Sequence, residues 1–314
     1  MSFDPSLIAK LNNQAVRNLI SHQDFDSTIR DLAAALKADH EALAAMSASS
    51  ASSQWSNNAS SDLPRITLSE FPKSLLSIDN WMVGASTDDG LASRPPPMTA
   101  EWRTSRTNGI VLYNARHHQD SLYVYSHPIL IPTEVTAVLY EAGRWQESER
   151  TVDNEVIFQL LQLAAIAITF NLAVAFQQAA VATAARTTTA TRTILPSSEQ
   201  ESKFKIFVMM QRSLKLFQQS YNLCRDTYRN WHHHIGSRCS TTLFTLAALN
   251  NVAALYKALG ESETASAGFQ DLLSSLMMCT VFETDSNKVS RYTAFFHNTA
   301  QLSYPDCSIC AGSA

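Results

Sequence analysis

The chain has 314 residues, of which 45% are hydrophobic and 17% charged, so it can bury a sizeable core and full-length disorder is excluded. Its 8 Gly and 10 Pro residues are too few for a many-stranded sandwich or a glycine-rich nucleotide-binding fold, and the composition favours helices. A net charge of −4 supplies no general attraction for nucleic acid or an anionic membrane.

The first stretch, residues 5–40, is predicted to form a pair of helices. Apolar residues recur at steps of three and four over residues 7–19 and again over residues 25–36, which is the spacing of a buried helical face. Asp26 or Ser27 is expected to cap the second helix, because a short polar side chain accepts hydrogen bonds from the first backbone amides. We therefore expect a helical hairpin here.

Three stretches of low complexity are expected to lie outside the folded core. Residues 41–66 are expected to be a linker, because Met46–Asp62 consists mostly of Ser, Ala and Asn and cannot bury enough apolar surface to offset its conformational entropy. Residues 181–203 are Thr-rich and are expected to form a loop that proteases cut first near its arginines. The tail, residues 304–314, is expected to be frayed.

Residues 67–150 are expected to be an insertion that contains a small β-hairpin. Two runs of β-branched and aromatic residues, 109–114 and 121–126, flank a short polar stretch and read as its strands. Pro128 and Pro132 then limit the following residues to an edge or extended conformation, because proline cannot donate to a sheet.

The remaining part, residues 151–303, is predicted to be helical. The longest apolar run, Leu160–Val181, is interrupted by Gln and Asn and rich in Ala, so we expect a buried core helix rather than a membrane span. Gly260 is expected to end one helix in the left-handed conformation. The predicted helices are residues 155–180, 204–228, 243–259, 263–278 and, as a cap, 289–302.

Self-similarity is the most informative feature of the sequence. One predicted pair has the pattern Leu249-x-x-Val252-Ala253-x-x-Tyr256, then Ala265-x-x-x-Phe269. This spacing resembles the tetratricopeptide repeat (TPR) family, which places small residues where two helices cross. Ala253 and Ala265 are therefore expected to face each other, with Tyr256 and Phe269 filling the space beside them.

Less complete copies of this pattern occur elsewhere. They are Asn13–Leu36, Phe170–Phe176 with Ser213–Ser220, and His297–Ala300. The resemblance implies a predominantly α-helical, right-handed α-solenoid of helical hairpins. The chain departs from the family in lacking its closing proline and in having insertions that break the regular repeat spacing.

The resemblance also implies a function, namely a non-catalytic scaffold or adaptor. In TPR proteins the first helix of each unit lines a concave face that holds a protein or peptide partner. By matching, the partner-binding residues are Lys10, Asn13, Arg17, Phe170, Val174, Gln177, Asn250, Ala254 and Lys257. The full Lys/Asn/Arg set of the carboxylate-clamp members is not reproduced, so a chaperone tail is not the expected ligand.

Motifs for other chemistry are weak. The glycines never fall in a phosphate-binding spacing, and no paired zinc motif occurs, so neither a cofactor nor a metal is expected. Trp231–His234 is interpreted as a helix-end loop, and Cys307 with Cys310 as an incidental pair. A positively charged series is interpreted as a solvated loop, without aromatic residues inside that loop for base stacking. It consists of Arg186, Arg192, Lys203, Lys205, Arg212 and Lys215.

Two alternative functions remain open at this point. The first is an RNA-binding helical-repeat protein, although nucleic acid is not the expected partner. The second is an enzyme with a site in residues 67–150 that uses His117, His118 or Asp120, whereas the leading hypothesis is a non-enzyme. The N-terminal residues lack a basic and an apolar region of a secretory signal, so we expect a cytoplasmic protein, with the nucleus as the alternative, and no membrane contact.

Overall fold

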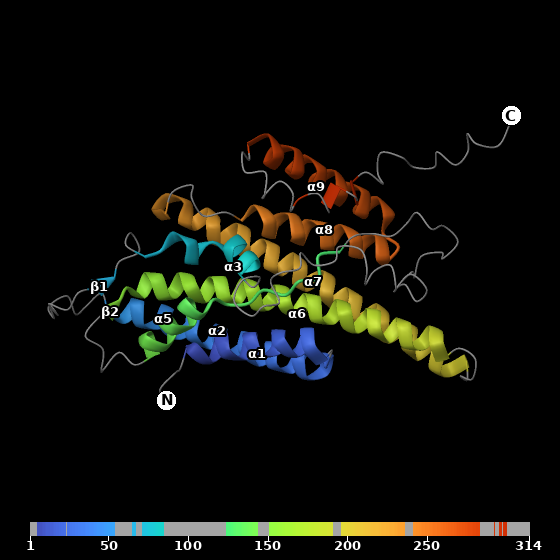
Figure 1. The fold of residues 1–314 in the computed structure, drawn as a ribbon, viewed down its shortest axis with the longest axis horizontal. Helices are drawn as coiled ribbons and strands as arrows, with labels where there is room; N and C mark the ends of the chain where they lie inside the picture. The colour runs from blue at the N-terminus through green and yellow to red at the C-terminus, as the bar shows by residue number, and fades with distance from the viewer. Residues whose placement is uncertain are drawn as a thin grey trace. The chain divides into compact units, whose positions relative to one another are not determined.

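A computed structural model describes most of the helical part of the chain. The described residues are 5–22, 24–53, 65–66, 71–84, 124–143, 151–190, 196–235 and 241–282, together with 292, 295, 296, 298 and 299. Most of them are helical (Figure 1), which confirms the prediction of a predominantly α-helical protein. The helices are α1 Ser6–His22, α2 Phe25–Ser53, η1 Lys73–Leu76, α3 Ile78–Gly84, α5 Thr133–Gly143, α6 Asn154–Ala190, α7 Pro196–Ile235, α8 Thr242–Ala258 and α9 Ser262–Phe282.

The chain divides into two compact units. Unit 1 consists of Met1–Ser93, His127–Ala175 and Gln219–Thr241, and unit 2 of Arg94–Ser126, Phe176–Gln218 and Thr242–Ala314. The first part of α6 and the last part of α7 therefore belong to unit 1, and their other parts to unit 2. The division thus falls within both long helices.

Unit 1 is built on the helical pair α1–α2, as predicted from the apolar spacing (Figure 1). The cap of α2 differs from the prediction: Asp24, and neither Asp26 nor Ser27, accepts a hydrogen bond, from the backbone amide of Ser27 at 3.1 Å. Asp24 stands just before the helix, in the position from which a side chain reaches the third backbone amide. The hairpin itself is confirmed.

Other short elements of unit 1 lie in the region predicted to be an insertion. Helix α5 packs against α1, and η1 packs against α3. The hydroxyl of Tyr228, on α7, donates to the carbonyl oxygen of Leu76 at 2.8 Å and accepts from the amide of Ile78 at 3.0 Å, which fixes the junction of η1 and α3. Two short strands, β1 Arg65–Ile66 and β2 Thr151–Val152, pair in parallel just outside that region. The predicted strand at 109–114 and the first half of that at 121–126 lie outside the described residues, and residues 124–126 form neither helix nor strand.

Unit 2 contains the pair α8–α9, which also agrees with the predicted helices. Gly260 has a φ of +87°, as predicted. Its amide donates to the carbonyl oxygen of Lys257, and the amide of Glu261 donates to that of Tyr256, which is the Schellman arrangement. At the helix crossing, a Cβ added to Gly268 would lie 3.0 Å from that of Ala253, so Gly268 is the small residue opposite Ala253.

Several helices are longer than the sequence predicts. Helix α2 continues through the Ser/Ala-rich stretch to Ser53, into the expected linker. Helix α6 continues to Ala190 and α7 begins at Pro196, so most of the expected loop at 181–203 is helical. Alanine is the strongest helix former, and the hydroxyl groups of Thr183 and Thr187 donate to carbonyl oxygens one turn earlier instead of competing with the helix.

Helix α6 is long and strongly apolar. It contains a stretch, Asn154–Thr187, that is long and apolar enough to cross a membrane, but 89% of its most apolar window is buried inside the protein. The side chains of Ile166, Phe170 and Val174 are fully buried. A helix whose lipid-like surface is already covered by protein serves as a core helix, which agrees with the prediction.

Candidate partner-binding site

An extended stretch, Val124–Pro132, has a backbone that is held by side chains of helices. Residues 124–132 are assigned neither helix nor strand, yet the backbone groups of Ile129 and Ile131 are hydrogen-bonded, as buried groups require. The partners are asparagine side chains, whose amide carries one acceptor and two donors and can copy the bonds of a neighbouring strand.

In unit 1, two asparagines each hold one residue of this stretch. Asn13 of α1 accepts from the amide of Ile131 at 2.8 Å and donates to its carbonyl oxygen at 2.7 Å. Asn171 of α6 likewise accepts from the amide of Ile129 at 2.6 Å and donates to its carbonyl oxygen at 2.7 Å. Because extended backbone repeats every second residue, Ile129 and Ile131 present the same edge to the two helices.

The two asparagines belong to one buried network. Asn12 accepts a hydrogen bond from Asn171 at 2.8 Å and donates to the Ile129 carbonyl oxygen at 3.2 Å. Asn12 and Asn171 are fully buried, as are the side chains of Ile129 and, nearly so, Ile131. Buried amide groups that are all bonded rigidify a core, whereas one unpaired group would be costly.

The two prolines of the stretch, which lack a backbone N–H, stand where the asparagines bind no amide. Ile129 and Ile131, whose amides the asparagines do bind, lie between Pro128 and Pro132. Pro132 also begins the next element, since its carbonyl oxygen accepts from the amide and the hydroxyl of Thr136 on α5. Residues 128–132 are neither helix nor strand, whereas helix α5 begins directly after Pro132, so the predicted extended conformation after that proline is wrong.

In unit 2, an asparagine side chain likewise binds the backbone of the neighbouring part of the stretch. Asn251 of α8 accepts from the amide of Tyr125 and donates to its carbonyl oxygen, both at 2.8 Å. Asn250 accepts a hydrogen bond from Asn298 at 2.6 Å, and Gln178 donates to the carbonyl oxygen of Ser126 at 3.2 Å. The Tyr125 ring stacks on Phe295, with 6.4 Å between centroids.

A short sequence signal marks these asparagines. Each stands two residues before an alanine, in the pattern Asn-x-Ala at Asn13, Asn171, Asn251 and Asn298. The residue before it is again asparagine at Asn12 and Asn250, which accept from Asn171 and Asn298 respectively. Sequence analysis missed Asn171 and Asn251 because it aligned the second and third repeats one residue earlier, at Phe170 and Asn250. One residue rotates a helical side chain by about 100°.

Three of the predicted partner-binding residues come together on one groove. Lys10, Asn13 and Arg17 line a groove of about 890 Å³ between α1 and α5 in unit 1. Lys10 and Arg17 are exposed, and the Lys10 ammonium lies 5.5 Å from the centroid of the Tyr140 ring. The other lining residues are Gln14, Asn18, Thr133, Thr136, Ala137 and Tyr140.

The other six predicted residues do not offer an open face. Phe170 and Val174 are fully buried in unit 1. In unit 2, Gln177 and Ala254 are buried and Lys257 is half-buried. Asn250 is fully buried and bonded to Asn298. The positions where a TPR-like protein would hold a partner are therefore inside the structure or beside the chain's own extended stretch.

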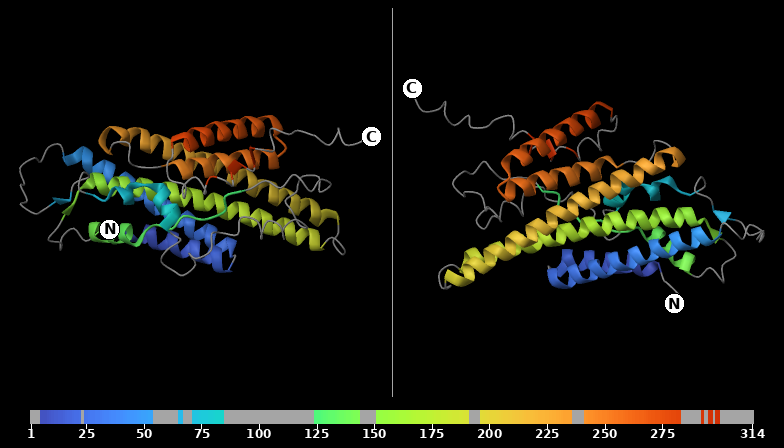
Figure 2. Two further views of the ribbon diagram at one scale, coloured as in Figure 1. Left: turned by 45° about the horizontal axis from the view of Figure 1, so that its top comes forward. Right: turned by 180° about the vertical axis from the view of Figure 1, so that it is seen from behind.

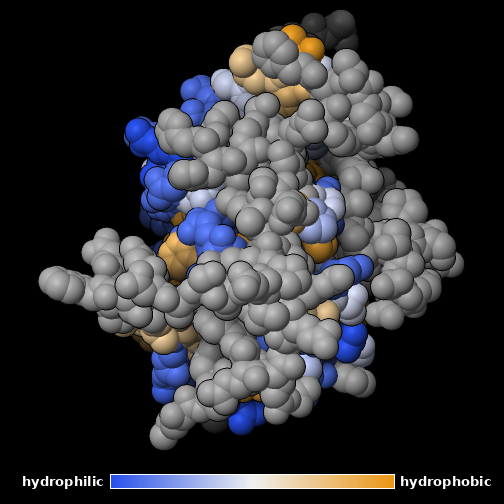
Figure 3. Space-filling view, turned by 90° about the vertical axis from the view of Figure 1, so that its left-hand side faces the viewer, coloured by the Kyte–Doolittle hydropathy of each residue, from blue (hydrophilic) through white to orange (hydrophobic). Residues whose placement is uncertain are grey.

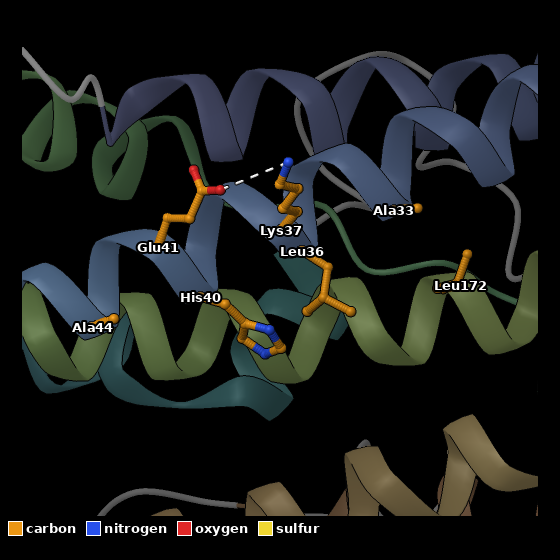
Figure 4. Close-up of a pocket in the computed structure, with 7 residues that line it drawn as sticks. All are labelled: Ala33, Leu36, Lys37, His40, Glu41, Ala44 and Leu172. Carbon is orange, nitrogen blue, oxygen red and sulfur yellow. Dashed lines mark ion pairs between the residues drawn. The ribbon is translucent and has the colours of Figure 1, made fainter. Parts of the chain in front are cut away.

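A second groove in unit 1 lies along α2 and is shown in Figure 4. Six of its lining residues come from α2, including Leu36 and His40, and Leu172 comes from α6. At its rim Lys37 and Glu41 form an exposed ion pair of 3.8 Å. An exposed pair of this kind contributes little to stability, and apolar walls beside it offer no arrangement for proton transfer.

Two buried titratable groups also lie in unit 1. Burial raises the pKa of Asp39 well above its ordinary value, and neither carboxylate oxygen has a hydrogen-bond partner in the described structure. Burial, with a further contribution from the charge of Asp79, strongly raises the pKa of the Cys224 thiol. Cys224 therefore stays protonated and unreactive at neutral pH.

The remaining sequence candidates have mixed outcomes. Trp231–His234 lies within α7, not in a loop after it, and Trp231 donates to the side chain of Gln162 at 3.1 Å. The described parts of the chain contain no group of three His, Cys, Asp or Glu side chains placed to hold a metal ion. His117, His118, Asp120, Arg192, Cys307 and Cys310 lie outside the described residues.

Surface hydropathy adds one observation. On the face shown in Figure 3, the coloured residues are mainly hydrophilic, with small separate hydrophobic areas.

Comparison with known proteins finds no matching family model, curated protein or solved structure. The functional conclusion therefore depends on the geometry of the described residues.

Proposed function

We propose that the protein is a non-catalytic adaptor, built from TPR-like helical hairpins, that binds an acidic segment of a partner protein in the groove between α1 and α5. The observation that best supports this proposal is that Lys10, Asn13 and Arg17 all line that groove. These residues are spaced along one face of α1, where residues three and four apart are neighbours. The pairs α1–α2 and α8–α9 support the repeat architecture.

The chemistry of the groove favours a negatively charged ligand. Its described lining contains two cations and no carboxylate, and the other polar lining groups are amides and hydroxyls. Tyr140 positions the Lys10 ammonium through a cation–π contact without neutralising its charge. Arginine and lysine beside amide groups match carboxylates of an acidic segment.

The groove is also the available part of the predicted binding face. Asn13 is bonded to the chain's own Ile131, and the two Ile side chains of the stretch are buried. A partner segment therefore meets Lys10 and Arg17 rather than the asparagines. We therefore propose recognition beside the extended stretch, at the end where α5 begins.

Charge reversal tests the proposal. A labelled peptide of alternating Glu and Val is expected to bind the wild-type protein, whereas a peptide of alternating Lys and Val is not. The Lys10→Glu, Arg17→Glu double variant should weaken binding by about tenfold or more, because two attractive pairs become repulsive. The matched control is Arg30→Glu with Lys37→Glu, two exposed cations of α2 in the same unit.

Both variants should keep the helical circular dichroism of the wild type, since all four side chains are exposed. Equal affinity of both variants for the acidic peptide would remove the groove from the account. The natural partner can then be sought by affinity purification with the same two variants, retaining only proteins that the control recovers and the groove variant loses.

A further inference from the structure

A second surface, independent of the groove, lies on unit 2 and is named here the basic hairpin. It consists of residues 176–190 of α6 and 196–218 of α7. In Figures 1 and 2 the neighbouring ends of these two helices lie well away from α8 and α9 of the same unit.

The hairpin differs from the rest of the chain in charge. Residues 176–190 and 196–218 contain five Lys or Arg against two Glu, a net charge of +3 in a chain whose net charge is −4. The described cations of this series are all exposed: Arg186, Lys203, Lys205, Arg212 and Lys215. A local concentration of one charge attracts an anionic partner even when the whole chain is acidic.

Two large aromatic side chains lie among these cations. Phe204 is 68% exposed and Phe207 is 41% exposed. They stand three residues apart, on the same face of α7. Lys203 and Lys205 flank Phe204. Exposed pairs of phenylalanines are uncommon on proteins that contact only water, and such patches mark interaction sites.

Helix α7 buries its opposite face, which leaves the face with Phe204 and Phe207 exposed to solvent. The inward positions are buried: Ile206, Met209, Met210, Ser213, Leu214 and Phe217. The outward positions start with Phe204 and Phe207, continue through half-exposed Val208 and end at Lys215. An apolar strip flanked by cations is the pattern of a helix that lies in a membrane–water interface.

We propose that the basic hairpin binds the surface of an anionic lipid bilayer. Its lysines and arginines lie against the headgroups, and the rings of Phe204 and Phe207 enter the boundary with the acyl chains. Cations around two exposed rings match both parts of the bilayer boundary, the anionic headgroups and the acyl chains. Sequence analysis expected no membrane contact, because the average charge conceals the hairpin and the exposure of the two rings is visible only in the structure.

Vesicle binding tests this assignment with the full chain. The protein should sediment with vesicles of phosphatidylcholine and phosphatidylserine in equal parts, and not with phosphatidylcholine alone. Raising the salt concentration should weaken the binding, because the attraction to the headgroups is screened. Lys203→Glu with Lys205→Glu should lower the affinity by about tenfold or more. Charge-matched Arg30→Glu with Lys37→Glu should leave the affinity within about twofold of wild type.

The aromatic residues have a matched control in the same unit. Phe204→Ser with Phe207→Ser should lower vesicle binding at least as much as the lysine reversal. Met277→Ser with Met278→Ser should not, although these side chains of α9 are 57% and 60% exposed, because α9 has no basic residue in its last turn. All of these side chains are at the surface, so the helical spectrum should be unchanged in each variant.

The following outcomes would overturn the proposal. Equal binding to neutral and anionic vesicles, or equal loss in the phenylalanine and methionine variants, would show that exposed apolar surface alone is responsible. Binding of labelled polyuridylate without binding to anionic vesicles would assign the basic hairpin to nucleic acid instead. The Lys10→Glu, Arg17→Glu variant, which loses the acidic-peptide site, should by contrast bind vesicles as the wild type does, since both residues belong to unit 1.

Discussion

The two units hold neighbouring parts of the same extended stretch with the same side-chain chemistry but in different surroundings. In unit 1, Asn13 and Asn171 bind the backbones of Ile131 and Ile129, and both isoleucines are buried. In unit 2, Asn251 binds the backbone of Tyr125, whose side chain is half-buried. The bonding pattern is therefore shared. The bonds between Asn171 and Ile129 are fully buried, whereas those between Asn251 and Tyr125 are part-buried.

This difference in burial sets the cost of losing each bond. The bonds between Asn171 and Ile129 are costly to remove, because water cannot replace a lost partner there. In unit 2 the half-buried Tyr125 leaves water closer to its bonds with Asn251. We therefore expect the same substitution to have unequal effects in the two units.

The largest effect is expected for Asn171→Ala in unit 1. The change leaves the amide of Ile129 and the side-chain oxygen of Asn12 without their partner. Each unsatisfied buried group costs about 1–3 kcal/mol, so the free energy of unfolding should fall by about 3 kcal/mol or more. Denaturant unfolding measures it. Asn80→Ala, an exposed asparagine of the same unit, should change it by about 0.5 kcal/mol or less.

Overpacking the helix crossing of unit 2 comes next. Ala253→Leu adds bulk where the Cβ of Ala253 already lies within 3.0 Å of the Cβ position at Gly268. The cost should be about 1–3 kcal/mol, measured by the same denaturation. Because the loss of stability is expected from the close approach to Gly268, Ala34→Leu on the exposed face of α2 should be close to neutral. Equal losses in both variants would rule out close packing as the reason.

A smaller effect is expected for Asn251→Ala, the counterpart of Asn171 in unit 2. The bonds to Tyr125 are part-buried, so water can reach the freed backbone groups and the cost should be about 1–2 kcal/mol. If Asn251→Ala destabilises the protein as much as Asn171→Ala, burial does not distinguish the units and the comparison fails.

The last change should act in the opposite direction. Burial raises the pKa of Asp39 above its ordinary value of 3.8. The unfolded chain therefore loses the proton first as the pH rises from about 4, and stability falls with pH until the folded carboxyl also ionises. Asp39→Asn removes this loss, so the variant should be more stable than wild type at pH 7 and similar to it below about pH 4. A constant difference across this range would contradict the assignment.

Local signals in the sequence predicted the long helices, but missed their ends and the short helices α3 and α5, which lie in the region predicted to contain a β-hairpin. Apolar spacing located α1, α2, α8 and α9, and Gly260 marked the turn between the last two. The ends of α2, α6 and α7 could not be placed because Ala, Ser and Thr were read as loop composition. In the structure, Thr183 and Thr187 satisfy their hydroxyl groups inside the helix.

The site was predictable only in part. Lys10, Asn13 and Arg17 were predicted by matching to the TPR pattern, and they line one groove in the structure. Asn171 and Asn251 were missed through a shift of one residue in the repeat alignment, which the shared Asn-x-Ala spacing would have corrected. That the asparagines hold the chain's own residues was beyond sequence reasoning, because Asn13 and Ile131 are 118 positions apart.

Hydrogen exchange of the amides of Ile129 and Ile131 tests the central claim most directly. Both lie in a stretch without helix or strand, where an unbonded amide would exchange quickly. We predict protection comparable to that of the helical core in the wild type. Protection should be lost at Ile131 in Asn13→Ala and at Ile129 in Asn171→Ala. Rapid exchange of both amides in the wild-type protein would contradict the claim that asparagine side chains hold the stretch.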